Sequence, residues 1–294
     1  DLYLEHTRLA TIASIHNSMS NYDELLVYND SCLQIAQLLK DSFLLIHSCN
    51  ALGVGQAYQE KFQAALKWFK QSQQLAEVLF ARSPYYEMKR SADQAPFFQR
   101  IPMGTLCRDV AATYIELNAP DSAEKNLDKA LAFSYQYKEY YNVVPALVLW
   151  SEVALAKEKD YEQALDSLEK AYRLSEQASL TAYNKNLILQ RKGQIYAAMG
   201  QVDSALLYYE RTIDFSKKEE NLKLLVGVYQ LLQDLYYEQG DYANAYTYQK
   251  KYQEAQKRLK DETYEKKLAA LEVKHELGTL RDNNEMLAVN NRLQ

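Results

Sequence analysis

The chain has 294 residues, a formal net charge of −5, and only 8 glycines and 5 prolines. So few turn-forming residues argue against a β-sandwich, a disordered chain and an α/β enzyme with glycine-rich phosphate loops, and the acidic balance argues against a nucleic-acid partner. The longest apolar stretches, such as residues 143–150, are too short to span a bilayer. The composition therefore predicts a long, predominantly helical chain.

A short motif recurs along the chain, with a small residue a few positions after each predicted turn. Its central residues are Leu25, Ala65, Ala123, Ala164, Ala205 and Ala245. They are 40 or 41 residues apart, except that 58 residues separate Ala65 from Ala123. Apolar residues at helical spacing on both sides of each turn predict two helices per unit, and a hairpin of this kind buries its apolar face only by stacking on its neighbours. We therefore expect six stacked hairpins, with about 17 extra residues after the second.

The fifth unit resembles the tetratricopeptide repeat (TPR) family, whose spacing is matched by Gly193, Tyr196, Gly200, Ala205 and Tyr209. The sixth unit matches through Tyr236, Gly240, Tyr242 and Ala245, whereas the first is degenerate because Leu25 replaces the alanine. The resemblance implies an all-α fold, a right-handed α-α superhelix (TPR solenoid) of about six helical hairpins with a long C-terminal helix. The solenoid is expected to cover residues 1–260.

The additional residues lie at about 82–103 and include three of the five prolines. Insertions in solenoids usually form a loop on one face. Three interpretations remain open: a loop in which Phe97 and Phe98 cover a flank of the second repeat, a lid over a ligand, or a disordered segment.

Residues 261–294 predict a helical connector with coiled-coil character. The pattern near its end alternates steps of four and three through Val273, Leu277, Leu280, Asn284, Leu287 and Asn291. Asparagines at core positions of a coiled coil set register and oligomer state, so a homodimer through this helix is expected. The alternative is a capping helix that folds back over the last repeat.

The order of repeats followed by a Lys/Glu-rich helix resembles the sensor regions of bacterial TPR-containing histidine kinases and membrane-anchored regulators. That resemblance implies an extracytoplasmic (periplasmic) input domain of a two-component system or a similar regulator, with a transmembrane segment beyond the connector. A cytoplasmic protein is the alternative.

The TPR resemblance also implies a groove lined by the first helix of each hairpin, where a peptide or protein ligand binds. The matching positions are Asn17, Asn50, Tyr58, Arg108, Asp109, Trp150, Lys157, Gln190, Arg191, Gln194, Gln230 and Asp234. Arginine, tryptophan and amide side chains suit a peptide backbone or a carboxylate.

No motif for catalysis, a cofactor or a metal is found. His47 and Cys49 are two residues apart, which places them on different faces of a helix, and His275 lacks the flanking residues of a phosphoacceptor motif. Whether Cys32 and Cys49 form a disulfide is left open. We expect a non-enzymatic sensor that relays ligand occupancy through its C-terminal helix; a soluble TPR scaffold and, less favoured, a fragment of a peptide-responsive transcriptional regulator are the alternatives.

Overall fold

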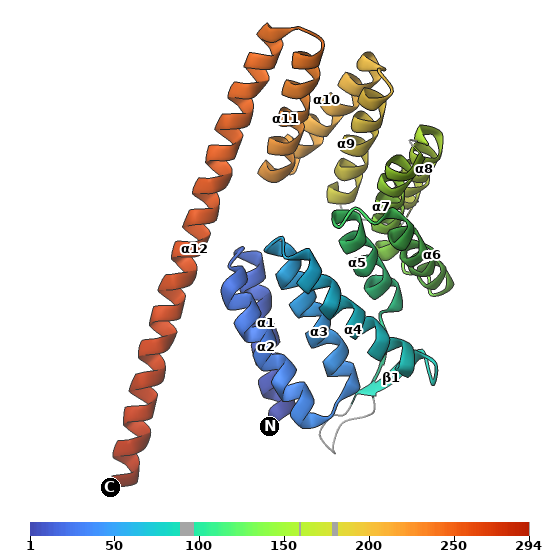
Figure 1. The fold of residues 1–294 in the computed structure, drawn as a ribbon. Coiled ribbons are helices and arrows are strands. Elements are labelled where there is room, and N and C mark those ends of the chain that lie inside the picture. Colours follow the sequence, from blue (N-terminus) through green and yellow to red (C-terminus); the bar gives the residue numbers. More distant parts are fainter. Residues whose placement is uncertain (89–96, 159, 178–181, 294) are drawn as a thin grey trace.

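A computed structural model describes residues 1–88, 97–158, 160–177 and 182–293, and these contain twelve helices in six consecutive hairpins (Figure 1). The first helices of the hairpins are α1 (Leu2–Ser18), α3 (Ser42–Tyr58), α5 (Met103–Glu116), α7 (Tyr140–Glu158), α9 (Ala182–Ala198) and α11 (Leu222–Glu238). The second helices are α2 (Tyr22–Leu39), α4 (Phe62–Phe80), α6 (Pro120–Gln136), α8 (Tyr161–Gln177), α10 (Val202–Lys218) and α12 (Tyr242–Leu293). The predicted all-α solenoid of six hairpins is confirmed.

The turn inside a hairpin places one residue in the left-handed region of backbone conformation. Gly200 and Gly240, which the sequence marks as turns, have φ of 73° and 75°. Ser20, Glu60 and Asn118 take the same conformation in the first three hairpins, with φ between 53° and 59°. At Gly200 the amides of this residue and the next donate to carbonyls of the last helical turn, which ends α9.

The repeated small residues lie where the two helices of each hairpin meet. Ala65, Ala123, Ala164 and Ala205 are fully buried, and the equivalent Ala245 is nearly so. In the second and fifth hairpins, an aromatic ring of the second helix packs directly against a glycine of the first: Phe69 against Gly53 and Tyr209 against Gly193. A Cβ atom on Gly193 would lie 2.5 Å from a ring carbon of Tyr209.

Replacing Gly193 with alanine is therefore expected to destabilise the protein by roughly 1–3 kcal/mol, because the buried Tyr209 ring has no space into which to move. Gly227 is the matched control: a Cβ there would approach the end of the Gln190 side chain, which has other rotamers. Gly227→Ala should be neutral or stabilising by up to about 1 kcal/mol through helix propensity. Urea denaturation followed by circular dichroism measures both; equal effects would contradict the packing argument.

The insertion contains a β-hairpin, which the expected loop did not include. Strand β1 (Tyr85–Met88) pairs antiparallel with β2 (Phe97–Arg100), so that Tyr85 lies opposite Arg100. Residues 89–96 and the side chains of Phe97 and Phe98 lie outside what the structure describes. The hairpin follows α4 and brings the chain back to the start of α5, so the solenoid continues on the other side of it.

Helix α12 has 52 residues and continues beyond the hairpin that it forms with α11, as Figure 1 shows. Its first part packs on α11 through Ala255, Tyr248 and Tyr252. The expected boundary between residues 260 and 261 falls inside this continuous helix. The side chains of the predicted coiled-coil seam, from Val273 to Asn291, lie outside the described part. Among the described residues, none of the helices is both long and apolar enough to cross a membrane.

Candidate binding surface on the first helices

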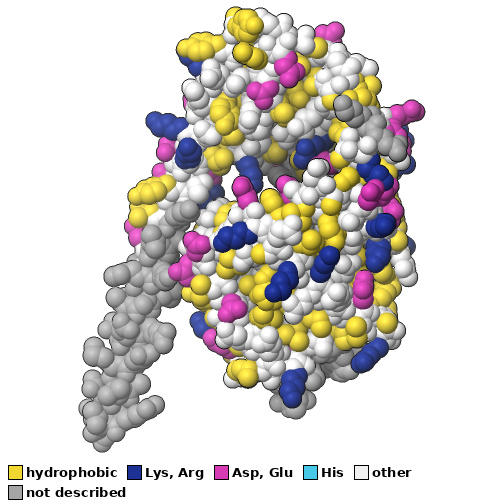
Figure 2. Space-filling model, in the orientation of Figure 1, with side chains coloured by type: hydrophobic (Ala, Val, Ile, Leu, Met, Phe, Trp, Pro, Cys, Tyr) yellow, Lys and Arg dark blue, Asp and Glu magenta, His cyan; other side chains and the backbone are white. Residues whose placement is uncertain are grey.

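Three cavities are bounded mainly by first helices of the hairpins, and the surface that these helices form is here called the first-helix surface. The N-terminal cavity, of about 350 Å³, lies between α1, α2 and α3. The middle cavity, of about 360 Å³, is bounded mainly by α3, α5 and α7, and the C-terminal cavity, of about 290 Å³, mainly by α9 and α11. The first two cavities share Val54, so they adjoin. Figure 2 shows the molecular surface hollowed between the upper and lower hairpins, with both acidic and basic side chains around the hollow.

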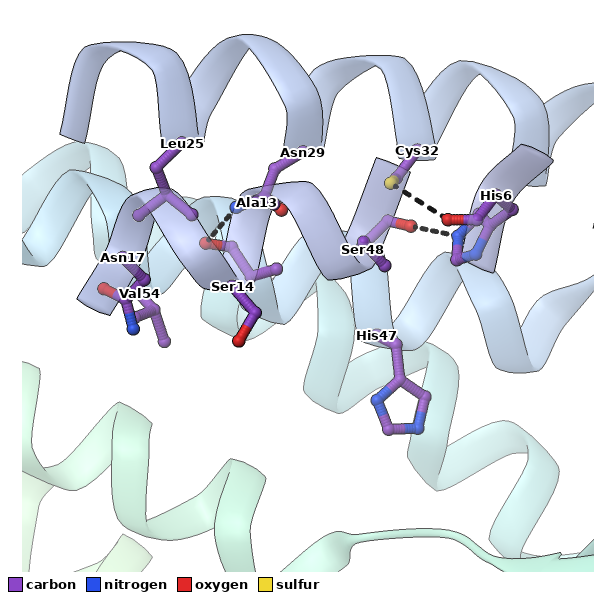
Figure 3. Close-up of a pocket in the computed structure, with 12 residues that line it drawn as sticks. His6, Ala13, Ser14, Asn17, Leu25, Asn29, Cys32, His47, Ser48 and Val54 are labelled. Atoms are coloured by element: carbon purple, nitrogen blue, oxygen red, sulfur yellow. Dashed lines mark hydrogen bonds between the residues drawn. The ribbon is translucent and has the colours of Figure 1, made fainter. Parts of the chain in front are cut away.

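The N-terminal cavity is lined by uncharged polar groups that satisfy one another. His6 Nε2 lies 3.3 Å from Ser48 Oγ, and the Cys32 thiol lies 3.7 Å from the His6 carbonyl, to which it donates. Asn29 donates to the Ala51 carbonyl at 3.2 Å, and the His47 ring projects from α3 away from these pairs (Figure 3). Burial lowers the pKa of His6, which keeps the ring neutral. Across the described ranges, no group of three or more His, Cys, Asp or Glu residues is arranged to hold a metal ion.

Three of the predicted groove residues join α3, α5 and α7 in one polar row. The Asn50 amide donates to Asp109 Oδ2 at 3.3 Å, and Arg108 forms a 2.9 Å ion pair with the other oxygen of Asp109. Arg108 also donates to Asn142 Oδ1 on α7 at 2.9 Å. The row fixes the Arg108 guanidinium between two helices and thereby sets the spacing of successive hairpins on this surface.

A second row joins α7 to α9. Arg191 Nη2 lies 2.6 Å from Glu152 Oε1, and its Nη1 donates to Gln194 at 3.1 Å. Burial raises the pKa of Glu152, while the positive charge of Arg191 opposes that shift. Gln194 and Asp234 line the C-terminal cavity together. Arg191 and Gln194 therefore lie on the first-helix surface.

The remaining predicted positions fall in different places. Tyr58 lines the middle cavity and stacks on Tyr22 with ring centroids 5.0 Å apart, and Asn17 lines the N-terminal cavity. Gln190 extends toward the backbone of α11 at Gly227, and Gln230 is exposed on α11.

Trp150 and Lys157 lie away from the first-helix surface, which corrects their expected placement. Trp150 Nε1 donates to Asp128 on α6 at 3.4 Å, and Lys157 forms ion pairs with Asp121 and Glu124 on the same helix. These two residues face the preceding second helix instead. The positions of α7 that face the neighbouring first helices are Asn142, Leu149 and Glu152.

Polar contacts link the insertion to the first-helix surface, and the sequence did not predict them. Arg100 on β2 forms a 2.8 Å ion pair with the buried carboxylate of Glu139, just before α7. The other oxygen of Glu139 accepts from Asn142 at 3.2 Å, and Asn142 in turn accepts from Arg108. A continuous set of polar contacts therefore runs from the β-hairpin to the row that Asn50 begins. No motif or spacing in the sequence indicates it.

All three cysteines are free and buried, so the open question of a disulfide between Cys32 and Cys49 is answered in favour of two thiols. Burial raises the pKa of Cys32, Cys49 and Cys107 to about 11. Because the thiolate is the nucleophile, we expect a thiol reagent at neutral pH to modify the folded protein very slowly and all three cysteines once urea unfolds it. Absorbance of the released chromophore measures this; rapid modification of a native thiol would contradict the described burial.

Comparison with known proteins shows a likeness to the tetratricopeptide repeat fold. Residues 188–218, which cover most of the α9/α10 hairpin, match the tetratricopeptide repeat model. The chain is similar to the apo form of RapI, with 13% identity and a TM-score of 0.65 over 89% of this chain and 86% of that one. It is also similar to BtubC from P. vanneervenii, with 14% identity and a TM-score of 0.60 over 81% and 92% of the two chains.

A third solved structure, NprR in complex with its cognate peptide NprX, has 15% identity and a TM-score of 0.61, covering 84% of this chain and 65% of that one. At these identities the likeness shows the fold. A comparison with curated proteins by sequence gives no match. The repeat match within α9 and α10, together with six stacked hairpins, shows that the chain has the fold of a tetratricopeptide repeat solenoid.

Proposed function

We propose that the chain is a non-enzymatic domain that binds a peptide or a protein segment along its first-helix surface. The observation that carries the proposal is the continuity of this surface: the N-terminal and middle cavities adjoin at Val54, and polar side chains of α3, α5, α7 and α9 follow it. Cavities with apolar walls and a few fixed polar groups are typical of ligand sites. An extended ligand would bury side chains in successive cavities.

Two structures of similar fold support a peptide as the ligand. NprR is in complex with its cognate peptide NprX, and a Rap protein with 13% identity and a TM-score of 0.61 is complexed with Competence and Sporulation Factor. Peptide binding is a property of those two proteins. We extend it to this chain because of the shared solenoid fold and the cavities described above.

Filling the middle cavity tests the proposal. Ala112 lines it, so Ala112→Trp should abolish binding of peptides selected from a random displayed library against the unmodified protein. Val78→Trp, on the exposed side of α4, is the matched control and should bind as before. Fluorescence polarisation measures binding, and circular dichroism confirms folding; Ala112→Leu replaces the tryptophan variant if that one fails to fold. Equal binding by the Ala112 and Val78 variants would overturn the proposed site.

We further propose that the domain acts as a sensor in signal transduction, with α12 as its output. Helix α11 supplies Leu231 and Asp234 to the C-terminal cavity and also packs against α12. A ligand that favours one arrangement of the hairpins would thereby shift α12. An extracytoplasmic setting, a homodimer through α12 and an output module beyond the connector belong to this proposal.

The sensor proposal is tested by the distance from α12 to the first hairpin. Spin labels on Val27→Cys and Lys260→Cys, both at exposed positions, report that distance, because the native thiols are buried. We expect the distribution of distances between the two labels, measured by double electron–electron resonance, to shift when a selected peptide binds. An unchanged distribution with saturating peptide would favour the alternative of a soluble scaffold or adaptor.

A further inference from the structure

The middle cavity combines an apolar interior with acidic side chains. Its apolar contributors include Val54, Phe62, Phe69, Ile115 and Leu149, which come from α3, α4, α5 and α7. Asp109, Glu116 and Glu152 also line it, and none of its described lining residues is a lysine or an arginine. A volume of about 360 Å³ accommodates a large side chain of a ligand together with part of its neighbour.

The three carboxylates are not equally neutralised. Arg108 pairs with Asp109, and Arg191 pairs with Glu152, so both arginines are already engaged. Glu116 forms no ion pair with any residue that the structure describes, and it is exposed to the cavity solvent. Glu116 and Glu152 line the same cavity, and the negative charge of Glu116 adds to the effect of burial in raising the pKa of Glu152. Glu116 is therefore the carboxylate of this cavity that can still pair with a cation of a ligand.

We infer that the middle cavity recognises a peptide in which an apolar side chain, buried among Phe69, Ile115 and Leu149, stands beside a lysine or arginine that pairs with Glu116. This inference rests on the proposed function and specifies its ligand class. The apolar walls supply burial, and the carboxylates supply the charge preference.

An acidic or neutral ligand fits the cavity less well. A carboxylate beside the apolar anchor would face Glu116 and Glu152, and no lysine or arginine is among the described residues that line the cavity. Placing like charges together is one way in which a binding site rejects a wrong partner. A neutral side chain would gain no ion pair with Glu116. A basic side chain gains that pair and avoids the repulsion, so the discrimination follows from the charges already in the site.

The sequences of selected peptides test the inference. A displayed library of random peptides about a dozen residues long is selected on the unmodified protein and sequenced. We expect enriched peptides to carry an apolar residue with lysine or arginine next to it or one position away. Synthetic versions should bind about tenfold more weakly when that basic residue is replaced by serine, and more weakly as salt rises from about 0.05 to about 0.5 M.

Glu116→Gln keeps the size of the side chain and removes its charge. It should weaken the basic peptides about tenfold and leave the serine peptides unchanged. Glu210→Gln, at an exposed position of α10, is the matched control and should change neither.

Enriched peptides without a basic preference, or equal effects of the Glu116 and Glu210 variants, would overturn the inference while leaving peptide binding intact. If no peptide is enriched over uncoated beads, the proposed function itself fails, and the inference fails with it.

Discussion

Replacing Tyr209 with alanine is expected to lower the free energy of unfolding by about 3–5 kcal/mol, as large-to-small changes in well-packed cores do. The Tyr209 side chain is 1% exposed and belongs to the cluster that joins α10 to α11 through Val228 and Leu232. Its ring lies directly over Gly193, so neither helix can move in to fill the space that the ring leaves. Urea denaturation followed by circular dichroism measures the loss.

Two further variants separate packing from the loss of a tyrosine as such. Tyr237→Ala removes the same side chain from a position that is 66% exposed, and should change stability by at most about 0.5 kcal/mol. Tyr209→Phe keeps the ring, and because the hydroxyl makes no hydrogen bond among the described residues, this variant should be close to the original. A Tyr209→Ala variant as stable as Tyr237→Ala would contradict the assigned repeat register.

The hairpins were predictable because their requirements are local and repeated. A left-handed turn favours glycine, which stands at Gly200 and Gly240, and the close approach of two helices requires a small residue such as Ala164 or Ala205. These residues recur at one period, so six weak signals support one another. At Glu60 and Asn118 a residue other than glycine takes the left-handed conformation. There the repeat period predicts the turn, because the local residue does not indicate it.

The orientation of α7 was not predictable in the same way. Its apolar residues pack into two clusters, one with α8 and α9 and one with α5 and α6, so they occupy more than one side of the helix. An amphipathic stripe normally shows which side faces the groove, and α7 has none. Carrying family positions onto it placed Trp150 and Lys157 in the groove, whereas Asn142 and Glu152 are the residues that contact α5 and α9.

The polar contacts between the insertion and the first-helix surface could not be predicted from the sequence for a different reason. Arg100 and Glu139 are separated by a complete hairpin, α5 and α6, and meet only because the repeats stack. A long-range ion pair leaves no periodic pattern in a single sequence. The prediction of a loop at residues 82–103 also rested on neighbouring residues alone, and it did not include the pairing of β1 with β2.

Removing the Arg100 side chain is the second change for which we expect a large effect. Arg100 is the cation that neutralises Glu139, whose side chain is only 6% exposed, and it also donates to the Tyr137 carbonyl at 3.3 Å. Arg100→Met would leave the buried carboxylate without its cation, with only neutral side-chain donors such as the amide of Asn142 and the hydroxyl of Tyr141. Breaking one side of a buried pair costs roughly 3–5 kcal/mol; because the Arg100 side chain is itself 29% exposed, we expect about 3 kcal/mol, at the low end of that range.

A control and a rescue make this prediction specific to the buried charge. Arg8→Met removes an arginine that is 59% exposed and pairs with Glu5 at the surface, so it should cost at most about 1 kcal/mol. The double variant Arg100→Met/Glu139→Gln replaces the stranded carboxylate by a neutral amide that still accepts from Asn142. It should recover at least about 1 kcal/mol relative to Arg100→Met alone.

The same denaturation series decides between two explanations of any loss. If charge burial is the cause, the double variant is more stable than the single one, because the second substitution removes the uncompensated charge. If the β-hairpin merely packs through the stem of Arg100 over the Tyr137 ring, whose centroid is 5.2 Å from the guanidinium carbon, the second substitution brings no recovery. A single variant no less stable than Arg8→Met would contradict both explanations and would mean that the insertion is not anchored to the solenoid through Glu139.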